Sequence, residues 1–121
     1  MTLQTDLTGI GWPGAWAEAE GHTIGTLAGI GTAQSGAARI SNTMTLVTTS
    51  SGQTAVVLPA NMPLASPYFV YNNSATAALL FPPSGCTIDN GSANASVSIA
   101  QNRGRMVIRV SATAFITVYG A

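Results

Sequence analysis

The sequence predicts an all-β protein, and three observations support this fold class. Short apolar runs, each about the length of one strand, recur from Thr43 to the C-terminus. Clusters of Gly, Pro, Asn and Ser separate these runs, and several runs alternate apolar and polar residues with a period of two. We therefore expect a jelly-roll-like antiparallel β-sandwich of seven or eight strands, preceded by an extended N-terminal arm.

The expected strands follow one another at short intervals. They cover residues 43–49, 54–58, 68–72, 77–81, 86–88, 95–100, 105–111 and 115–119. Pro59 and Pro82 should each end the strand before them, because proline cannot donate a hydrogen bond to a sheet ladder. The pair Asn90-Gly91 predicts a tight turn after the fifth of these strands.

The alternation of apolar and polar residues is clearest in the strand that begins at Arg105. A period of two places Met106, Ile108 and Val110 on one face, and we expect this face to point into the core. The opposite face, which we expect to point to solvent, then carries Arg105, Val107 and Arg109.

Two of the expected strands are apolar on both faces. One carries Phe69 and Tyr71, and the next carries Leu79 and Leu80. A strand that is apolar on both sides is usually buried on both sides. In so small a domain one side can face the core, and the other most simply meets another subunit. We therefore expect a homotrimer with Phe69, Tyr71, Leu79 and Leu80 near the three-fold contact.

Residues 1–42 differ in kind from residues 43–121, which we expect to form the β-sandwich body. The first segment is rich in glycine, which disfavours a helix, and it contains no run of β-branched residues long enough for a strand of the body. Disordered tails are poor in aromatic residues, yet this segment contains Trp12 and Trp16. We expect an extended arm that becomes ordered by packing against a partner.

The charges are divided between the two segments in a complementary way. Asp6, Glu18 and Glu20 lie within the first 20 residues, whereas the remainder of the chain carries four arginines and one aspartate. We expect Trp12 and Trp16 to anchor the arm on a partner protein, and the three acidic residues to orient it.

The composition narrows the range of partners. The chain has 121 residues, four arginines, no lysine and four acidic residues, for a formal net charge of zero. So weakly charged a surface favours association with other protein subunits and lacks the basic footprint that nucleic acid requires. The N-terminus does not resemble a signal peptide, and no apolar run reaches the length of a membrane span. We expect synthesis in the cytoplasm and no membrane partner.

The chemistry-bearing residues are too few and too scattered for catalysis. His22 is the single histidine and Cys86 the single cysteine, and they lie in different segments. Glu18 and Glu20 are the one close pair of carboxylates, and both lie in the expected arm. Residues 9–14 match G-x-G-x-x-G, but no strand precedes them, which argues against a dinucleotide loop. We expect no catalytic residue, metal site, cofactor or small-molecule substrate.

Several stretches resemble a pattern that recurs in small β-sandwich modules of tailed-bacteriophage virions. They are TAVVLP at 54–59, YFVYN at 68–72, LLFPPSGCTID at 79–89 and SVSIA at 96–100, followed by Gly104. The resemblance covers residues 43–121, and its motifs are structural. The chain departs from the pattern at Cys86, where a small residue is usual, and in lacking a tryptophan near Phe115.

The resemblance implies a non-enzymatic virion protein. The expected role is that of a capsid decoration, or cement, protein that binds the outer surface of the phage head as a homotrimer and stabilises the lattice of the major capsid protein. A head-fibre or tail-fibre module that binds a host receptor or carbohydrate is the alternative. The shortness of the chain favours decoration, because a fibre subunit normally needs a long shaft or further domains. A carbohydrate-binding sandwich is a third possibility, but it would require several exposed aromatic residues along a groove, and the body contains few.

Overall fold

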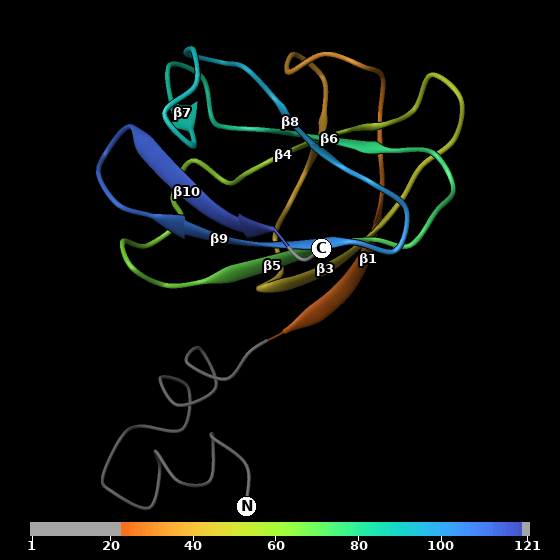
Figure 1. Cartoon of the computed structure of the whole chain (residues 1–121), viewed down its shortest axis with the longest axis horizontal. Helices are drawn as coiled ribbons and strands as arrows, with labels where there is room; N and C mark the ends of the chain where they lie inside the picture. Colours follow the sequence, from red (N-terminus) through yellow and green to blue (C-terminus); the bar gives the residue numbers. More distant parts are fainter. Residues whose placement is uncertain (1–22, 120–121) are drawn as a thin grey trace, which may run out of the picture.

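The computed structural model describes residues 23–119, whose strands form two stacked sheets (Figure 1). In spatial order, the six-stranded sheet contains β1 (Ile24–Ala28), β3 (Met44–Thr48), β5 (Tyr68–Asn72), β9 (Gly104–Arg109), β10 (Ala114–Tyr119) and β7 (Thr87–Ile88). The four-stranded sheet contains β2 (Ala38–Arg39), β4 (Ala55–Val57), β6 (Ala78–Phe81) and β8 (Val97–Ile99). The all-β prediction is confirmed for these residues.

From β1 to β6 the chain passes alternately between the two sheets. Each pass through both sheets, β1 with β2, β3 with β4 and β5 with β6, is called a rung here. Strands of successive rungs pair in parallel, β1 with β3 and β3 with β5 in one sheet, and β2 with β4 and β4 with β6 in the other. The strand of the opposite sheet thus supplies the long crossover that parallel pairing needs. The stacking resembles a short β-solenoid.

The prediction of an antiparallel sandwich is wrong for these rungs. Among the described residues, antiparallel pairing between strands occurs for β5 with β9, β9 with β10 and β6 with β8, in the second half of the chain. The short segment after Asn72 is not a hairpin, because the strands that it connects, β5 and β6, lie in different sheets. Tight loops do not distinguish a hairpin within one sheet from an arch between two sheets, so the sequence did not reveal the winding.

The predicted boundary between arm and body at residue 42 also needs correction. β1 and β2 are strands of the two sheets, so the body begins before Thr43. Glycine allows this packing: Gly29 donates its backbone N–H to the Thr48 carbonyl at 2.9 Å, and a Cβ at Gly29 would lie 2.8 Å from the Gln53 carbonyl oxygen. The glycine therefore permits the close approach of two rungs. Residues 1–22 lie outside the described residues.

The core lies between the sheets and joins every rung. Its buried residues come from both sheets and from the loops that connect them, and they are Ala38, Ile40, Val47, Val56, Leu58, Met62, Val70, Ala78, Leu80, Cys86, Ile88, Ile99, Val107 and Phe115. The predicted turn at Asn90-Gly91 is confirmed, because Gly91 donates to the Ile88 carbonyl at 3.0 Å and Asn90 has a φ of 60°.

The predicted orientation of β9 is wrong. Val107 is fully buried between the sheets, so its neighbours Met106 and Ile108 point to the outer side. Arg105 and Arg109 share the inner side with Val107, but each lies where its guanidinium reaches backbone carbonyls at the margin of the sandwich. Arginine can occupy an inward position there because its apolar stem is covered while its head is hydrogen-bonded.

Asn72 is a buried polar residue that links the two sheets at the end of β5. Its Nδ2 donates to the carbonyls of Thr76 and Ile99, both at 2.9 Å, and its Oδ1 accepts from the N–H of Ser74 at 3.0 Å. The side chain is fully buried, and its hydrogen bonds hold the loop after β5 against β8. The hydrogen bond to the Ile99 carbonyl is buried, whereas the Thr76 carbonyl also accepts from the Thr49 hydroxyl at 2.6 Å.

We expect Asn72→Ala to lower the free energy of unfolding by about 3 kcal/mol, because it removes three hydrogen bonds, one of them to the buried Ile99 carbonyl. Asn73→Ala is the matched control, since Asn73 is exposed, and it should change the free energy by less than about 0.5 kcal/mol. Urea denaturation followed by circular dichroism measures both. Equal losses in the two variants would contradict the assignment.

Candidate interaction surfaces

The outer side of the six-stranded sheet is apolar across five strands. On each strand the residues beside the buried ones point away from the core. We define the outer face by the large side chains of this set, which are Ile24, Met44, Leu46, Phe69, Tyr71, Met106, Ile108, Ile116 and Val118. None of them is charged. Four are among the most exposed large hydrophobic residues of the described chain: Ile24 (68%), Phe69 (44%), Ile116 (40%) and Val118 (58%).

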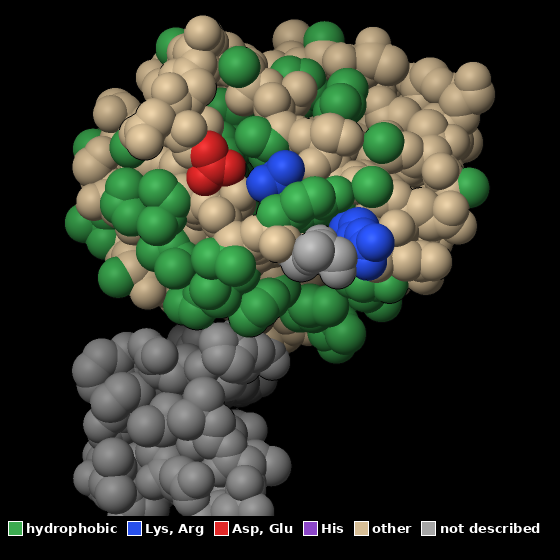
Figure 2. Space-filling model, in the orientation of Figure 1, with side chains coloured by type: hydrophobic (Ala, Val, Ile, Leu, Met, Phe, Trp, Pro, Cys, Tyr) green, Lys and Arg blue, Asp and Glu red, His purple; other side chains and the backbone are tan. Residues whose placement is uncertain are grey.

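The register of the strands aligns five of these residues. Ile24 pairs with Met44, Met44 with Phe69, Phe69 with Met106, and Met106 with Val118. This apolar row crosses β1, β3, β5, β9 and β10. Figure 2 shows hydrophobic side chains gathered along the lower side of the body, where Figure 1 places these strands. An apolar surface this continuous is unusual on a protein that stays alone in water.

A shallow groove of about 390 Å³ interrupts the outer face beside Gly104. Gly104 lies opposite Tyr71 in the pairing of β5 with β9, and a Cβ at Gly104 would lie 3.3 Å from the Tyr71 ring. The missing side chain therefore makes room for that ring and leaves a depression next to it. The groove is lined by Met44, Phe69, Val70, Tyr71, Gly104, Arg105, Met106 and Val118.

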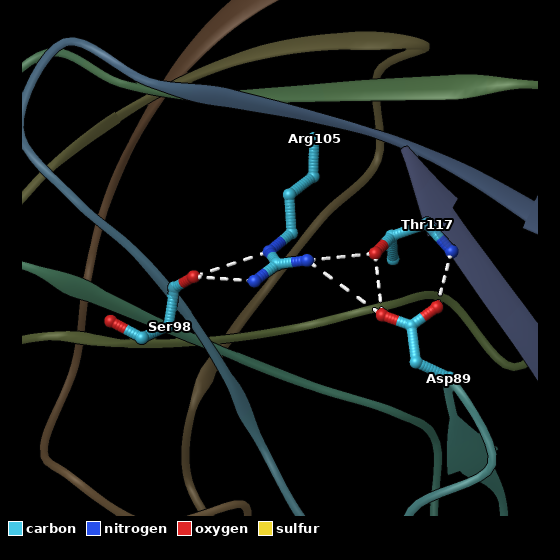
Figure 3. Close-up of polar contacts among 4 residues, drawn as sticks. All are labelled: Asp89, Ser98, Arg105 and Thr117. Carbon is cyan, nitrogen blue, oxygen red and sulfur yellow. Dashed lines mark hydrogen bonds and ion pairs between the residues drawn. The ribbon is translucent and has the colours of Figure 1, made fainter. Parts of the chain in front are cut away.

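Arg105 ties the two sheets together at one side of the sandwich (Figure 3). Its Nε and Nη2 donate to the Ser98 carbonyl at 3.1 and 2.9 Å, and its Nη1 donates to Thr117 Oγ1 at 2.8 Å. Asp89 Oδ2 lies 3.7 Å from Arg105 Nη1, and its two oxygens accept from the N–H and hydroxyl of Thr117. The guanidinium also lies 4.0 Å from the centre of the Tyr119 ring. These contacts join β9 and β10 to β8.

Arg109 has a similar role at the other end of β9. Its Nη1 donates to the carbonyls of Ala60 and Met62, at 3.0 and 2.9 Å, and its Nη2 donates to the Ala112 carbonyl at 2.6 Å. Arg105 and Arg109 therefore donate hydrogen bonds mainly to backbone carbonyls, and Asp89 contacts both Thr117 and Arg105. Sequence reasoning assigned these charges to solvent, because spacing alone does not show which carbonyls lie nearby.

The structure separates the four residues expected at the three-fold contact. Phe69 and Tyr71 lie on the outer face. This is the side of β5 that the prediction requires to be covered by another subunit. Leu80 is fully buried in the core, so it cannot contact a second copy. Leu79 is its neighbour in β6 and points to the outer side of the four-stranded sheet, away from Phe69. The expectation for Leu80 is therefore wrong, and Leu79 belongs to a different surface.

The residues expected to bind a partner through the arm lie outside the described residues. They are Asp6, Trp12, Trp16, Glu18 and Glu20. Sequence reasoning missed Ile24, Met44, Met106 and Val118 as surface residues. The signal that could have revealed Met106 was the alternation of apolar and polar residues in its strand, which was read as placing Met106 on the core face.

A second groove, of about 440 Å³, lies at the four-stranded sheet and is called the Arg39 groove here. Arg39 of β2 is exposed in it, and Gln34 forms part of its wall. Gln34 Nε2 donates to the Pro82 carbonyl at 2.7 Å and to Asn94 Oδ1 at 3.2 Å, which fixes the position of this wall. The lining residues are Gln34, Ser35, Arg39, Val57, Leu58, Ala60, Pro83 and Ser84.

Other features of the described residues bear on chemistry. Cys86 is buried, and its Sγ lies 3.9 Å from the Ser84 carbonyl oxygen and 4.0 Å from that of Ala112. Within residues 23–119 no three His, Cys, Asp or Glu side chains form a group that could hold a metal ion. The same part of the chain contains no helix long and apolar enough to cross a bilayer.

We expect Arg105→Ala to lower the free energy of unfolding by about 2 kcal/mol, because it removes the hydrogen bonds to Ser98 and Thr117. The ion pair with Asp89 adds little, since that carboxylate is partly exposed. Arg103→Ala is the matched control: Arg103 is exposed, and this variant should lose less than about 0.5 kcal/mol. The midpoints of urea unfolding report both. A loss in Arg103→Ala as large as that in Arg105→Ala would argue against the cross-link.

Comparison with known proteins gives little. Neither protein-family profiles nor curated protein sequences match this chain. Among solved structures, it resembles part of a chain in the structure of a chaperone-substrate complex, with a TM-score of 0.43 and 11% sequence identity. The resemblance covers 81% of this chain but 17% of the other, so this chain spans a small fraction of that protein's length.

Proposed function

We propose that this chain is a structural protein of a tailed-bacteriophage virion. In this role it is a capsid decoration, or cement, protein that binds the outer surface of the head as a homotrimer and stabilises the lattice of the major capsid protein. The observation that carries the proposal is the exposed and uncharged outer face of the six-stranded sheet. Such a face fits a protein whose working state is covered by other subunits.

The distribution of charge supports the same role. Arg105 and Asp89 form contacts with each other and with Thr117, and Arg109 donates to backbone carbonyls. Arg39 and Arg103 remain as the exposed arginines of the described body. With so little charge on the surface, copies of the protein can approach one another and a protein lattice without strong repulsion.

The proposed mechanism is mechanical rather than catalytic. Backbone pairing joins the rungs, and hydrogen bonds of Arg105, Arg109 and Asn72 link the two sheets and their loops. The thiol of Cys86 is buried. A stiff body of this kind can hold neighbouring capsid subunits at a fixed distance. In the proposal the arm residues Trp12 and Trp16 supply apolar anchors on the major capsid protein, with Asp6, Glu18 and Glu20 orienting them.

We expect the double variant Trp12→Ala, Trp16→Ala to bind capsids at least about tenfold more weakly than the unmodified chain, because buried aromatic anchors dominate protein interfaces. The assay is co-sedimentation of the purified full chain with capsids that have been stripped of it. The matched comparison is Asp6→Asn, Glu18→Gln, Glu20→Gln, which should reduce affinity about twofold to threefold, since exposed charges contribute little.

Two results would count against the proposal. If the unmodified chain does not sediment with capsids, decoration is wrong. If the triple charge variant loses more affinity than the double tryptophan variant, the arm acts through electrostatics and the anchors are wrongly assigned. A cryo-EM map of the virion locates the protein independently of either variant.

A receptor-binding module of a head fibre or tail fibre is the second candidate, and the Arg39 groove favours it. The groove combines the exposed guanidinium of Arg39 with the side chains of Gln34, Ser35 and Ser84. A guanidinium recognises carboxylates through paired hydrogen bonds, so an acidic surface glycan of the host is the ligand class that fits.

For this second candidate we expect binding to acidic glycans on a glycan array, and about tenfold weaker binding by Arg39→Ala because the carboxylate loses its charged partner. Arg103 is another exposed arginine, and the variant Arg103→Ala should bind like the unmodified chain. Binding that survives Arg39→Ala, or the absence of any glycan binding, would remove this candidate.

A further inference from the structure

We propose that the outer face of the six-stranded sheet is the surface through which copies of this chain contact one another. The inference rests on the proposed homotrimer and deepens it, because it replaces the contact expected from the sequence. Leu80 is excluded as a core residue, and Leu79 lies on the other sheet. The contact surface proposed here instead consists of Phe69 and Tyr71 together with the outward residues of β1, β3, β9 and β10 of the same chain.

The first argument is the absence of charge on this face. No outward residue of the outer face is ionised, and its centre is the apolar row, from Ile24 on β1 to Val118 on β10. An uncharged apolar face is complementary to a copy of itself, because neither partner brings a charge that would be buried without a counter-ion. A nucleic acid or an anionic membrane would require basic residues here.

The second argument is area. Strands lie about 4.8 Å apart and the outward residues of one strand span about 20 Å, so five strands present roughly 500 Å². Two copies stacked face to face would bury about 1,000 Å², the lower limit for a specific interface. Three copies that turn this face toward a common axis would also bury about 500 Å² each, divided between two neighbours. The area is therefore sufficient for contact between copies, and the number three comes from the proposed homotrimer.

The third argument is shape. The groove beside Gly104 lies within the same face, close to the apolar row. Phe69 and Val118 border it and are 44% and 58% exposed, which makes them the projecting side chains next to the depression. A projecting side chain of one copy can enter the groove of the next, which gives the contact a defined geometry and prevents sliding of two smooth sheets.

The experiment measures the molar mass of the full chain by light scattering at micromolar concentration. The unmodified protein should have three times the 12.3 kDa mass of one chain. Phe69→Glu and Met106→Glu should each weaken association by at least about a hundredfold, because each copy would bury a carboxylate without a partner. The matched control is Ser98→Glu, which adds the same charge at an exposed strand position of the four-stranded sheet and should remain trimeric.

Circular dichroism checks that each variant is folded. If Met106→Glu does not fold, Ile24→Glu replaces it, because Ile24 is 68% exposed at the edge of the same row. A monomeric unmodified chain, or folded Phe69→Glu that stays trimeric, overturns the inference. Capsid co-sedimentation separates the two proposals: a trimer that does not bind capsids contradicts decoration alone, whereas a trimer that is broken by Ser98→Glu and not by Phe69→Glu contradicts this face alone.

Discussion

Backbone pairing between successive rungs is the constraint on which the other features of this protein depend. β1, β3 and β5 pair in parallel in one sheet, while β2, β4 and β6 do so in the other. Because side chains alternate with a period of two, a shift of one residue in this pairing would exchange the inner and outer sides of a strand. The same register that buries Val47 and Val70 therefore places Met44 and Phe69 side by side on the outer face.

The margins of the sandwich explain how a face without charge can coexist with arginine on the inner side of β9. Arg105 and Arg109 lie where they can donate to backbone carbonyls of neighbouring loops and of β8. These guanidinium groups join the sheets and are removed from the outer surface. The charged groups of β9 are thus hydrogen-bonded at the margins of the sandwich. The outer face carries apolar residues, which another subunit can cover.

Much of the strand pattern could be predicted from the sequence, for local reasons. Residues 68–71 are β-branched or aromatic and follow Pro67, and the strand predicted at 68–72 has the bounds of β5 in the structure. β1 was missed because Gly25 and Ala28 dilute its β propensity, and β2 because a two-residue strand has no period. The orientation of β9 was misread because two arginines seemed to mark a solvent face. Nothing within the strand shows that both reach carbonyls distant in sequence.

The sequence by itself determined the all-β class, the positions of most strands, the turn at Asn90-Gly91 and the low charge of the surface, since each depends on neighbouring residues or on composition. The tertiary structure alone decided that the strands wind in parallel rungs, that residues 24–39 contribute to both sheets, and that Leu80 is in the core while Met106 is outside it. These outcomes depend on which strands meet across long stretches of chain, and a period of two is the same whichever side faces the core.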